Sequence, residues 1–387
     1  MKKRGHGRNR CDLSLAILWI LGLTIAFALM LAVLGQLLGG EPVTVETAAV
    51  PAPSISARSA VVMDLTSGRV MYAKNGDKKA YPASTTKIMT VLLGLEYGQL
   101  DQRVTVAKEA VGVEGSSIYL VHDEVISMKD LLYGALLRSG NDAATAIAAE
   151  IGGGSVDGFI ALMNQRAKEL GAEATQFTNP TGLFDEEHYT TAYDMALMAR
   201  AAMQNPAFAE IAGAKSWTAQ RQDGRDPYFS NKNKVVHQYE GGTGVKIGYT
   251  EASGRTLVAS SQRDGRKLIC VVMNAPDWFN DSYRLMDWAY DHYELATAVE
   301  AGGRVEKIPL EGGVRDTVWV GVKEEVTCLI LPEERDHLAV ACDLEGPVTA
   351  PIRRGDEAGL LHLYLSGEYV YSLPLYFMED VDEVTTW

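Results

Sequence analysis

The hydrophobic and polar positions along the chain divide it into three parts with different periodicities. Residues 13–40 carry no charged side chain and are mostly apolar, a run long enough to cross a bilayer with some tilt. Within residues 58–296, short apolar runs at both ends enclose segments in which apolar residues recur at helical spacing. Residues 297–387 show only short alternating segments between Gly, Pro and charged turns. The chain is therefore expected to contain a membrane segment and two folded domains.

A basic segment precedes the apolar run at the N-terminus. Residues 1–12 contain five Lys or Arg, which favours a cytoplasmic N-terminus with the remainder of the chain outside the membrane. We expect a transmembrane signal-anchor at 13–40 and thus a single-pass protein of the cell membrane; a cleaved signal peptide is the alternative. Residues 41–57 are rich in Pro, Ala, Ser and Thr and are expected to form an extended linker.

The pattern within residues 58–296 predicts an α+β domain. Strands are expected at 60–65, 69–73, 242–249, 255–261 and 267–273, and helices at 88–95, 131–137, 143–151, 159–170 and 282–293. Ser127 with Asp130, and Thr191 with Asp194, resemble helix N-terminal caps. Since strands come first and last, both ends of this segment are expected to complete one antiparallel sheet that carries a helical subdomain.

The segments after residue 297 predict a small all-β sandwich. Alternating runs lie near 304–310, 317–322, 325–331, 338–344 and 360–373. Cys328 and Cys342 could face each other across a hairpin, and an external location would permit a disulfide, while two unpaired buried cysteines are the alternative.

Charge and motif content exclude some classes of function. The chain has a formal net charge of −14, and residues 41–387 alone hold 31 basic and 49 acidic side chains, a net of −18. Such a surface repels nucleic acid. No C-x-x-C or H-E-x-x-H motif occurs, so neither a dedicated metal site nor a cofactor is expected.

The strongest chemical signal is the tetrapeptide Ser84-Thr85-Thr86-Lys87, which lies at the start of a predicted helix. Free N–H groups and the helix dipole favour negative charge there. Lys87 lies one turn after Ser84 on the same face, so its amine can reach the hydroxyl. A desolvated lysine loses basicity and can accept the Ser84 proton. The alternative is an ordinary helix cap followed by a solvated lysine.

Two further motifs carry candidate polar groups. Ser139-Gly140-Asn141 separates two helical segments, and Gly140 would permit an unusual backbone. Lys246-Ile247-Gly248, followed by Tyr249-Thr250, lies on a predicted strand that could bind an extended peptide along its edge. Gly248 would allow a close backbone approach. Alone, Ser139-Gly140-Asn141 is better explained as an ordinary helix–helix turn with an Asx cap, and a K-x-G tripeptide carries almost no information.

Taken in this order, the three motifs resemble the S-x-x-K, S-x-N and K-T-G set of penicillin-binding proteins and serine β-lactamases. The similarity extends to PASTTKIMT, LLRSGNDAATAIA, NPTGLFDEEHYTTAYDMALMARAA and GVKIGYTEASGRTLVASSQRDGRKLICVVMNAP. These segments resemble the low-molecular-mass DD-carboxypeptidases of peptidase family S11, and the segment from EGGVRDTVW onward resembles the C-terminal β-domain of that branch. The resemblance covers nearly all of residues 58–380.

The resemblance implies a reaction, a substrate and a role for each motif residue. Ser84 would attack a peptidoglycan stem pentapeptide to release its terminal D-alanine, with Lys87 as the base and Ser139 in proton transfer to the leaving group. Substrate binding would fall to Asn141, Lys246, Gly248, Tyr249 and Thr250, and the backbone N–H groups of Ser84 and Tyr249 would stabilise the oxyanion. β-Lactams would act as covalent inhibitors.

One position departs from the family pattern, because Ile247 stands where the third motif usually has Thr. The missing hydroxyl would cost about 1.5–3 kcal/mol if nothing replaces its bond to a carboxylate. Thr243 and Thr250 are candidate replacements. This departure supports one alternative, a non-catalytic wall-binding scaffold on the same fold. A second alternative, a β-lactamase, fits less well, because it would need neither the extra β-domain nor the membrane anchor. A Ser-His-Asp esterase fits poorly, because no G-x-S-x-G elbow occurs.

Three other features have a structural interpretation from sequence. His188 is expected to be structural, because the proposed scheme needs no histidine base. Lys232 could add positive charge near a carboxylate, although a solvated lysine is the simpler reading. The aromatic residues near the last helix of this domain are expected to form its core face: Trp278, Phe279, Tyr283, Trp288 and Tyr290.

Overall fold

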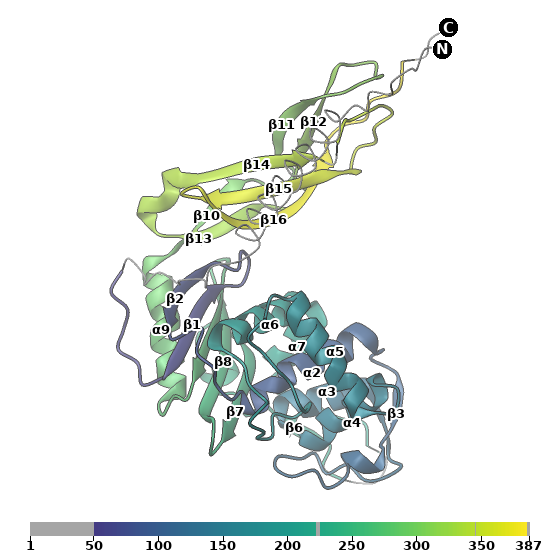
Figure 1. Ribbon diagram of the computed structural model, residues 1–387, viewed down its shortest axis with the longest axis vertical. Helices are drawn as coiled ribbons and strands as arrows, with labels where there is room; N and C mark the ends of the chain where they lie inside the picture. The colour runs from purple at the N-terminus through teal and green to yellow at the C-terminus, as the bar shows by residue number, and fades with distance from the viewer. Residues whose placement is uncertain (1–49, 222–224, 345, 385–387) are drawn as a thin grey trace, which may run out of the picture. The chain divides into compact units, whose positions relative to one another are not determined.

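The computed structural model describes residues 50–221, 225–344 and 346–384 (Figure 1). The predictions for residues 1–12, 13–40 and most of the linker lie outside these ranges. Within them, no single helix has the length and apolar character needed to cross a membrane. The α4 and α5 helices (Asn141–Ile151 and Val156–Glu169), which meet at 89°, pass that test only as a bent pair.

The first domain is built on a five-stranded antiparallel sheet in the order β2-β1-β9-β8-β7. Its strands are β1 Ser59–Asp64, β2 Val70–Lys74, β7 Gly242–Thr250, β8 Gly254–Arg263 and β9 Arg266–Met273. The two ends of the domain meet where β1 pairs with β9. The prediction of one sheet completed from both ends is confirmed.

Helices cover both faces of this sheet (Figure 1). One face packs against a helical group, and α9 (Trp278–His292) covers the other with the predicted aromatic residues in or against its core. The group consists of η1 Ala83–Thr86, α2 Lys87–Tyr97, α3 Met128–Leu137, α4, α5, α6 Ala192–Gln204 and α7 Pro206–Gly213. Shorter elements are β3 Arg103–Thr105, η2 Lys108–Ala110, β4 Val125–Ser127, β5 Ser216–Thr218, β6 Tyr228–Ser230 and α8 Val235–Gln238.

Local sequence signals explain where several helices begin. The Ser127 and Thr191 hydroxyls accept hydrogen bonds from the backbone N–H groups of Asp130 and Asp194, at 3.1 and 3.0 Å, as their spacing predicts. The α4 helix begins differently, because its N-cap is Gly140, without a side-chain cap. Asp142 uses its carboxylate elsewhere, as described below.

The second domain is all-β. Its five-stranded sheet has the order β11-β12-β16-β15-β14, and β10 pairs with β13 in a second sheet. The elements are β10 Glu294–Val299, β11 Arg304–Pro309, β12 Thr317–Gly321, β13 Val326–Ile330, η3 Pro332–His337, β14 Leu338–Leu344, β15 Glu357–Leu365 and β16 Glu368–Phe377. The predicted class, α+β followed by an all-β domain, is confirmed.

The two cysteines of this domain are free thiols. Cys328 lies on β13 opposite Ala296, whereas Cys342 lies on β14 opposite Leu361. Because the two strands belong to different sheets, no hairpin brings the sulfur atoms together. The disulfide considered from sequence is therefore wrong, and the alternative of unpaired cysteines holds.

Candidate active site

Ser84 and Lys87 lie where the η1 turn runs into α2. Lys87 is the first residue of α2, and its Nζ lies 3.1 Å from Ser84 Oγ. Ala83, directly before the serine, has a φ of +49°, and Gly182 packs against its carbonyl so closely that a Cβ there would overlap it. Neighbouring backbone therefore fixes the turn that presents Ser84.

The Lys87 amine is fully buried and has three polar partners. Besides Ser84, it contacts Asn141 Oδ1 and the Thr181 carbonyl, both at 2.6 Å. Burial, together with the nearby charge of Lys246, holds the pKa of Lys87 well below the usual value for lysine. The two carbonyl oxygens can only accept hydrogen bonds, so both N–H groups of a neutral amine satisfy them. The nitrogen lone pair is then left for the Ser84 hydroxyl.

A second buried lysine faces Ser139. Lys246 Nζ lies 3.0 Å from Ser139 Oγ and donates to its neighbour's carbonyl, that of Ile247, also at 3.0 Å. Burial lowers the pKa of Lys246 to about 7, with a smaller contribution from the charge of Lys232. Ser139, rather than Gly140, adopts the unusual backbone, with a φ of +61°. The glycine instead provides space, because a Cβ there would lie 2.9 Å from Asp142 Oδ1.

The strand β7 forms one wall of the site at the edge of the sheet. A Cβ on Gly248 would lie 3.0 Å from the Ser84 nitrogen, which confirms the close approach expected at this glycine. Tyr249 is exposed beside it. The Ile247 side chain packs against the core cluster that includes α9, so it lies on the other face of the sheet from the Lys246 amine. Ile247 therefore does not replace the contact that a threonine hydroxyl at this position would make with a carboxylate.

The two threonines considered as replacements are engaged elsewhere. Thr243 Oγ1 lies 2.6 Å from Ser260 Oγ, and Thr250 Oγ1 donates to Ser253 Oγ at 2.9 Å. Both hydroxyls thus stabilise strand pairing or the turn after β7, and neither contacts Lys246 or Ser84 in this structure.

An irregular segment, residues 111–124, runs beside the site and is fastened to the start of α4. Asn141 donates from its backbone to the Ser116 carbonyl at 2.7 Å and from its amide to the Glu114 carbonyl. Lys232 donates to Ser116 Oγ at 3.3 Å. The Asp142 carboxylate accepts from Ser117, Ile118 and Leu120. Asn141, which contacts the Lys87 amine, therefore also holds the loop of residues 111–124.

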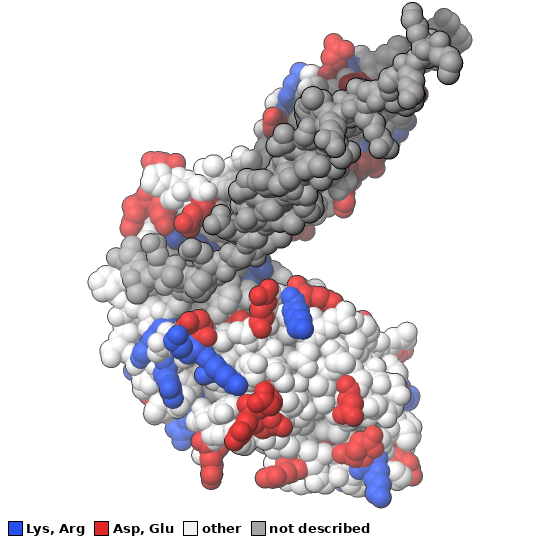
Figure 2. All heavy atoms as spheres, in the orientation of Figure 1, with Lys and Arg blue, Asp and Glu red and all other residues white. Residues whose placement is uncertain are grey.

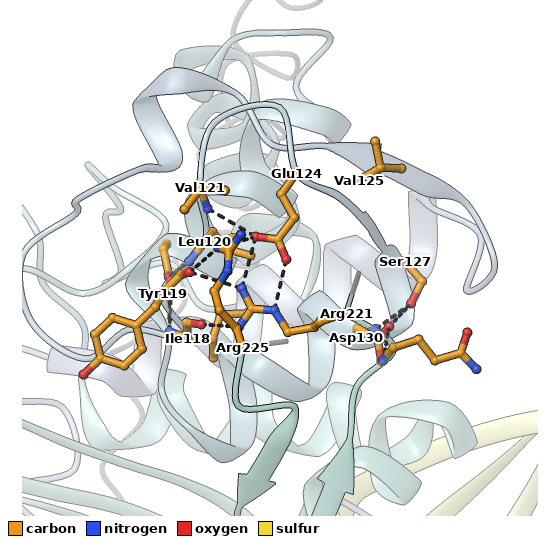
Figure 3. Close-up of polar contacts among 12 residues, drawn as sticks. Ile118, Tyr119, Leu120, Val121, Glu124, Val125, Ser127, Asp130, Arg221 and Arg225 are labelled. Atoms are coloured by element: carbon orange, nitrogen blue, oxygen red, sulfur yellow. Dashed lines mark hydrogen bonds and ion pairs between the residues drawn. The ribbon is translucent and has the colours of Figure 1, made fainter. Parts of the chain in front are cut away.

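A buried ion pair fastens the far end of the same loop (Figure 3). Arg221 Nε lies 3.0 Å from Glu124 Oε1, and their side chains are only 1% and 7% exposed. Arg221 also donates to the Ile118 and Tyr119 carbonyls, at 2.6 and 3.1 Å, and Arg225 contacts the same glutamate at 3.0 Å. The loop is thus held by Asp142 at one side and by Arg221 at the other.

His188 is buried and supports the turn at Ser84. Its Nδ1 accepts from the Thr178 backbone N–H at 3.0 Å, so Nε2 carries the proton and donates to Thr86 Oγ1 at 2.8 Å. Burial, with the charge of Lys87, lowers the pKa of His188 to about 4. A neutral histidine with both nitrogens occupied fits the structural role expected from sequence. Within the described ranges, no group of three or more His, Cys, Asp or Glu side chains could hold a metal ion.

The structure thus brings Ser84, Lys87, Ser139, Asn141, Lys246, Gly248 and Tyr249 to one place. Four other residues contribute to the site without a motif that predicts them. Thr181 acts through its carbonyl, which no side-chain pattern can indicate. Asp142 follows Asn141 at the start of a helical segment, where its position alone does not indicate that it holds a loop. Glu124 and Arg221 are far apart in sequence and carry no motif; only their pairing within a buried site distinguishes them.

Family models match almost all of the described chain. Residues 45–277 match the D-alanyl-D-alanine carboxypeptidase family, and residues 293–383 match the C-terminal domain of penicillin-binding protein 5. The chain therefore belongs to the D-alanyl-D-alanine carboxypeptidase family and is an enzyme of the serine type, with the two-domain organisation of low-molecular-mass penicillin-binding proteins.

Individual relatives agree over most of their length. The chain is 33% identical over 334 residues to D-alanyl-D-alanine carboxypeptidase DacF of Bacillus subtilis, covering 84% of this chain and 86% of the relative. It is 34% identical over 360 residues to DacC of Escherichia coli, covering 86% of each. Penicillin-binding protein 5 of Haemophilus influenzae superposes with a TM-score of 0.69 at 29% identity, over 87% of this chain and all of that structure.

Proposed function

We propose that this protein removes the terminal D-alanine from peptidoglycan stem pentapeptides through an acyl-enzyme on Ser84. The observation that carries this proposal is the Lys87 amine, which is fully buried, has a lowered pKa and lies 3.1 Å from Ser84 Oγ. A neutral amine at this distance is a competent general base for a serine nucleophile.

In the first half-reaction, Lys87 takes the hydroxyl proton as Ser84 Oγ attacks the carbonyl carbon of the penultimate D-alanine. The carbonyl electron pair moves onto oxygen, where the backbone N–H groups of Ser84 and Tyr249 stabilise the oxyanion. When the tetrahedral intermediate collapses, the C–N bond breaks. The leaving amine takes up the proton that Lys87 removed from Ser84, delivered through the hydroxyl of Ser139, which lies 3.0 Å from Lys246 Nζ.

In the second half-reaction, Lys87, neutral again, takes a proton from the water that attacks the ester on Ser84. It returns this proton to Ser84 Oγ as the ester C–O bond breaks. Asn141 has two tasks in this scheme: it orients the Lys87 amine, at 2.6 Å, and binds the substrate amide. Lys246 and Lys232 supply positive charge for the terminal carboxylate, and Gly248 with Thr250 shapes the strand along which the peptide lies. A β-lactam would acylate the same serine.

We also propose that the chain is anchored in the cell membrane by residues 13–40, with both folded domains outside. The proposal rests on sequence alone: an uncharged apolar run preceded by a basic flank. Protease added to intact cells should degrade the folded domains while the protein stays in the membrane fraction. Release of the full protein by high salt alone would contradict the proposal.

The direct test of the catalytic proposal uses a fluorescent penicillin with the full chain and its Ser84→Ala variant, followed by intact-mass measurement. A covalent adduct in the parent that is absent from the folded variant would identify the nucleophile. D-Alanine release from a stem pentapeptide would then identify the reaction. A folded parent that forms no adduct and releases no D-alanine would instead favour the scaffold alternative.

A further inference from the structure

A hollow of about 240 Å³ lies at one end of the central sheet. It is lined by Arg58 and Ser59, where β1 begins, by Lys79 to Tyr81, and by Ser253 in the turn between β7 and β8. Tyr81 precedes Ser84 by three residues. The hollow is therefore close to the nucleophile, although the catalytic scheme above uses none of its side chains.

The strand β7 connects the site to the hollow. Gly248 lies against the backbone of Ser84, and two residues later the strand ends at Thr250 and enters the turn that lines the hollow. Since an extended chain advances about 3.3 Å per residue, the hollow begins about 7–10 Å from the reacting serine. A peptide lying beside β7 would reach it one to three residues from the scissile bond.

The charges around Ser84 set the direction of such a peptide. Lys246 and Lys232 both lie toward Ser139 and Ser116, on the opposite side of Gly248 from the turn after β7. The free C-terminal carboxylate of a substrate is attracted to these two cations. The N-terminal, upstream part of the peptide must then run toward Thr250 and the hollow.

The hollow presents two basic side chains without acidic partners. Within the described part of the chain, Lys79 has no ion pair, and its Nζ rests 3.6 Å from the centre of the Tyr189 ring, which holds the ammonium in place. The Arg58 guanidinium also has no ion pair there. The adjacent Lys78, by contrast, is paired with Asp77 at 3.2 Å.

Two basic side chains at one hollow, without acidic partners among the described residues, contrast with the overall acidic charge of the protein. Residues 41–387 carry a net charge of −18, yet Figure 2 shows Lys and Arg side chains gathered over the region of β1 and β2 on the catalytic domain. A guanidinium fork and an ammonium at one hollow suit a carboxylate, and the exposed Asn274 amide on its rim adds a donor. Glu251, in the neighbouring turn, opposes an anion, so the expected preference is moderate.

We propose that this hollow is a subsite for a carboxylate carried by the stem peptide upstream of its terminal D-alanyl-D-alanine. The inference rests on the proposed function and adds a substrate preference to it: peptides with a free upstream carboxylate react faster than those in which that group is amidated or absent.

The test compares two synthetic peptides that end in D-alanyl-D-alanine and differ only in an upstream carboxylate or its carboxamide. With the full-length protein, kcat/KM for D-alanine release should be about three- to tenfold higher for the carboxylate, and the difference should shrink at high salt. The double variant Arg58→Gln/Lys79→Gln should treat both peptides alike. Lys78→Gln is the matched control and should keep the preference, because that lysine is already paired.

Penicillin labelling of Ser84 separates this inference from the proposed function, since penicillin carries no upstream stem peptide. All variants should label at the parent rate. Normal labelling and D-alanine release without a preference in the parent, or a preference that survives in the double variant, would overturn the subsite alone. A folded parent that neither labels nor releases D-alanine would overturn the proposed function and the subsite with it.

Discussion

The catalytic domain contains two groups of buried charge that are arranged in opposite ways. Lys87 and Lys246 are 0% and 1% exposed, yet within residues 50–221, 225–344 and 346–384 their amines contact only neutral oxygen atoms. Glu124 and Arg221 are nearly as buried, but they contact each other at 3.0 Å. The first group consists of lysines that have no counterion among the described residues, and the second is a charge pair.

We infer that the two groups have different roles: Lys87 and Lys246 serve the reaction, whereas the Glu124–Arg221 pair stabilises the structure of the loop. A buried cation without a counterion costs stability and responds by losing its proton, as the lowered pKa values of both lysines indicate. That response is what a general base requires. A buried ion pair stays charged, and its directional hydrogen bonds fix the loop that contacts Asn141. Replacing members of each group should therefore have opposite consequences for activity and stability.

The largest effect is expected from Lys87→Met. Losing the base should slow penicillin labelling and D-alanine release by about a thousandfold or more. The free energy of unfolding should change little, because relief from burying a polar amine offsets the lost hydrogen bonds. Labelling rates and urea unfolding measure the two quantities. The exposed Lys108→Met is the control and should be unchanged in both. Labelling within tenfold of the parent would refute the assignment of Lys87 as the base.

Arg221→Met should reverse this pattern. It leaves the buried Glu124 carboxylate with the contacts to Arg225 and to the Val121 backbone N–H but without its most buried cation, so the free energy of unfolding should fall by about 3 kcal/mol. Folded molecules should still label, with a raised KM for peptide, because the loop that holds Asn141 loosens. Urea unfolding and steady-state kinetics test this.

The double variant Arg221→Met/Glu124→Leu provides the control for this prediction. It removes the orphaned carboxylate and should recover part of the lost stability. A single variant as stable as the parent, or a double variant less stable than the single one, would show that the pair does not hold the loop.

The Lys246→Met variant tests how much a buried lysine with no counterion among the described residues lowers the free energy of unfolding, and how this effect depends on pH. In the parent, the folded-state pKa of about 7 lies below the ordinary lysine value of 10.5. Between these pH values the unfolded chain binds a proton that the folded chain does not, so the free energy of unfolding rises with pH in the parent. At pH 6 the variant should be more stable than the parent by about 1–3 kcal/mol, with the advantage lost toward pH 10. Urea unfolding at both pH values measures this; a variant less stable at pH 6 would contradict it.

Ile247→Thr should have the smallest effect. The new hydroxyl can contact a carboxylate only if it turns toward the site, and the ethyl group that it replaces belongs to a side chain packed against the cluster that includes α9. We expect penicillin labelling to accelerate no more than about tenfold and the free energy of unfolding to fall by about 1 kcal/mol. A parallel comparison with Ile247→Val separates lost packing from the added hydroxyl. Acceleration by valine would rule out the hydroxyl as the cause.

The sequence by itself determined most of the local structure. Helical periodicity, strand alternation and the caps at Ser127 and Thr191 depend on residues a few positions apart, so they can be read along the chain. The contact between Ser84 and Lys87 belongs to the same class, because one helical turn separates them. The resemblance to a known family gave meaning to the order of the motifs and, with it, indicated the partners of these two residues.

Only the tertiary structure decided which charges are buried and what they face. Asn141, Thr181 and Lys246 approach Ser84 and Lys87 from elements 54 to 162 residues away, through packing that no periodicity encodes. The use of Asp142 to hold a loop, the Glu124–Arg221 pair and the separation of Cys328 from Cys342 likewise depend on how distant segments pack. Burial sets the pKa of a lysine, and burial is a property of the folded chain rather than of its sequence motif.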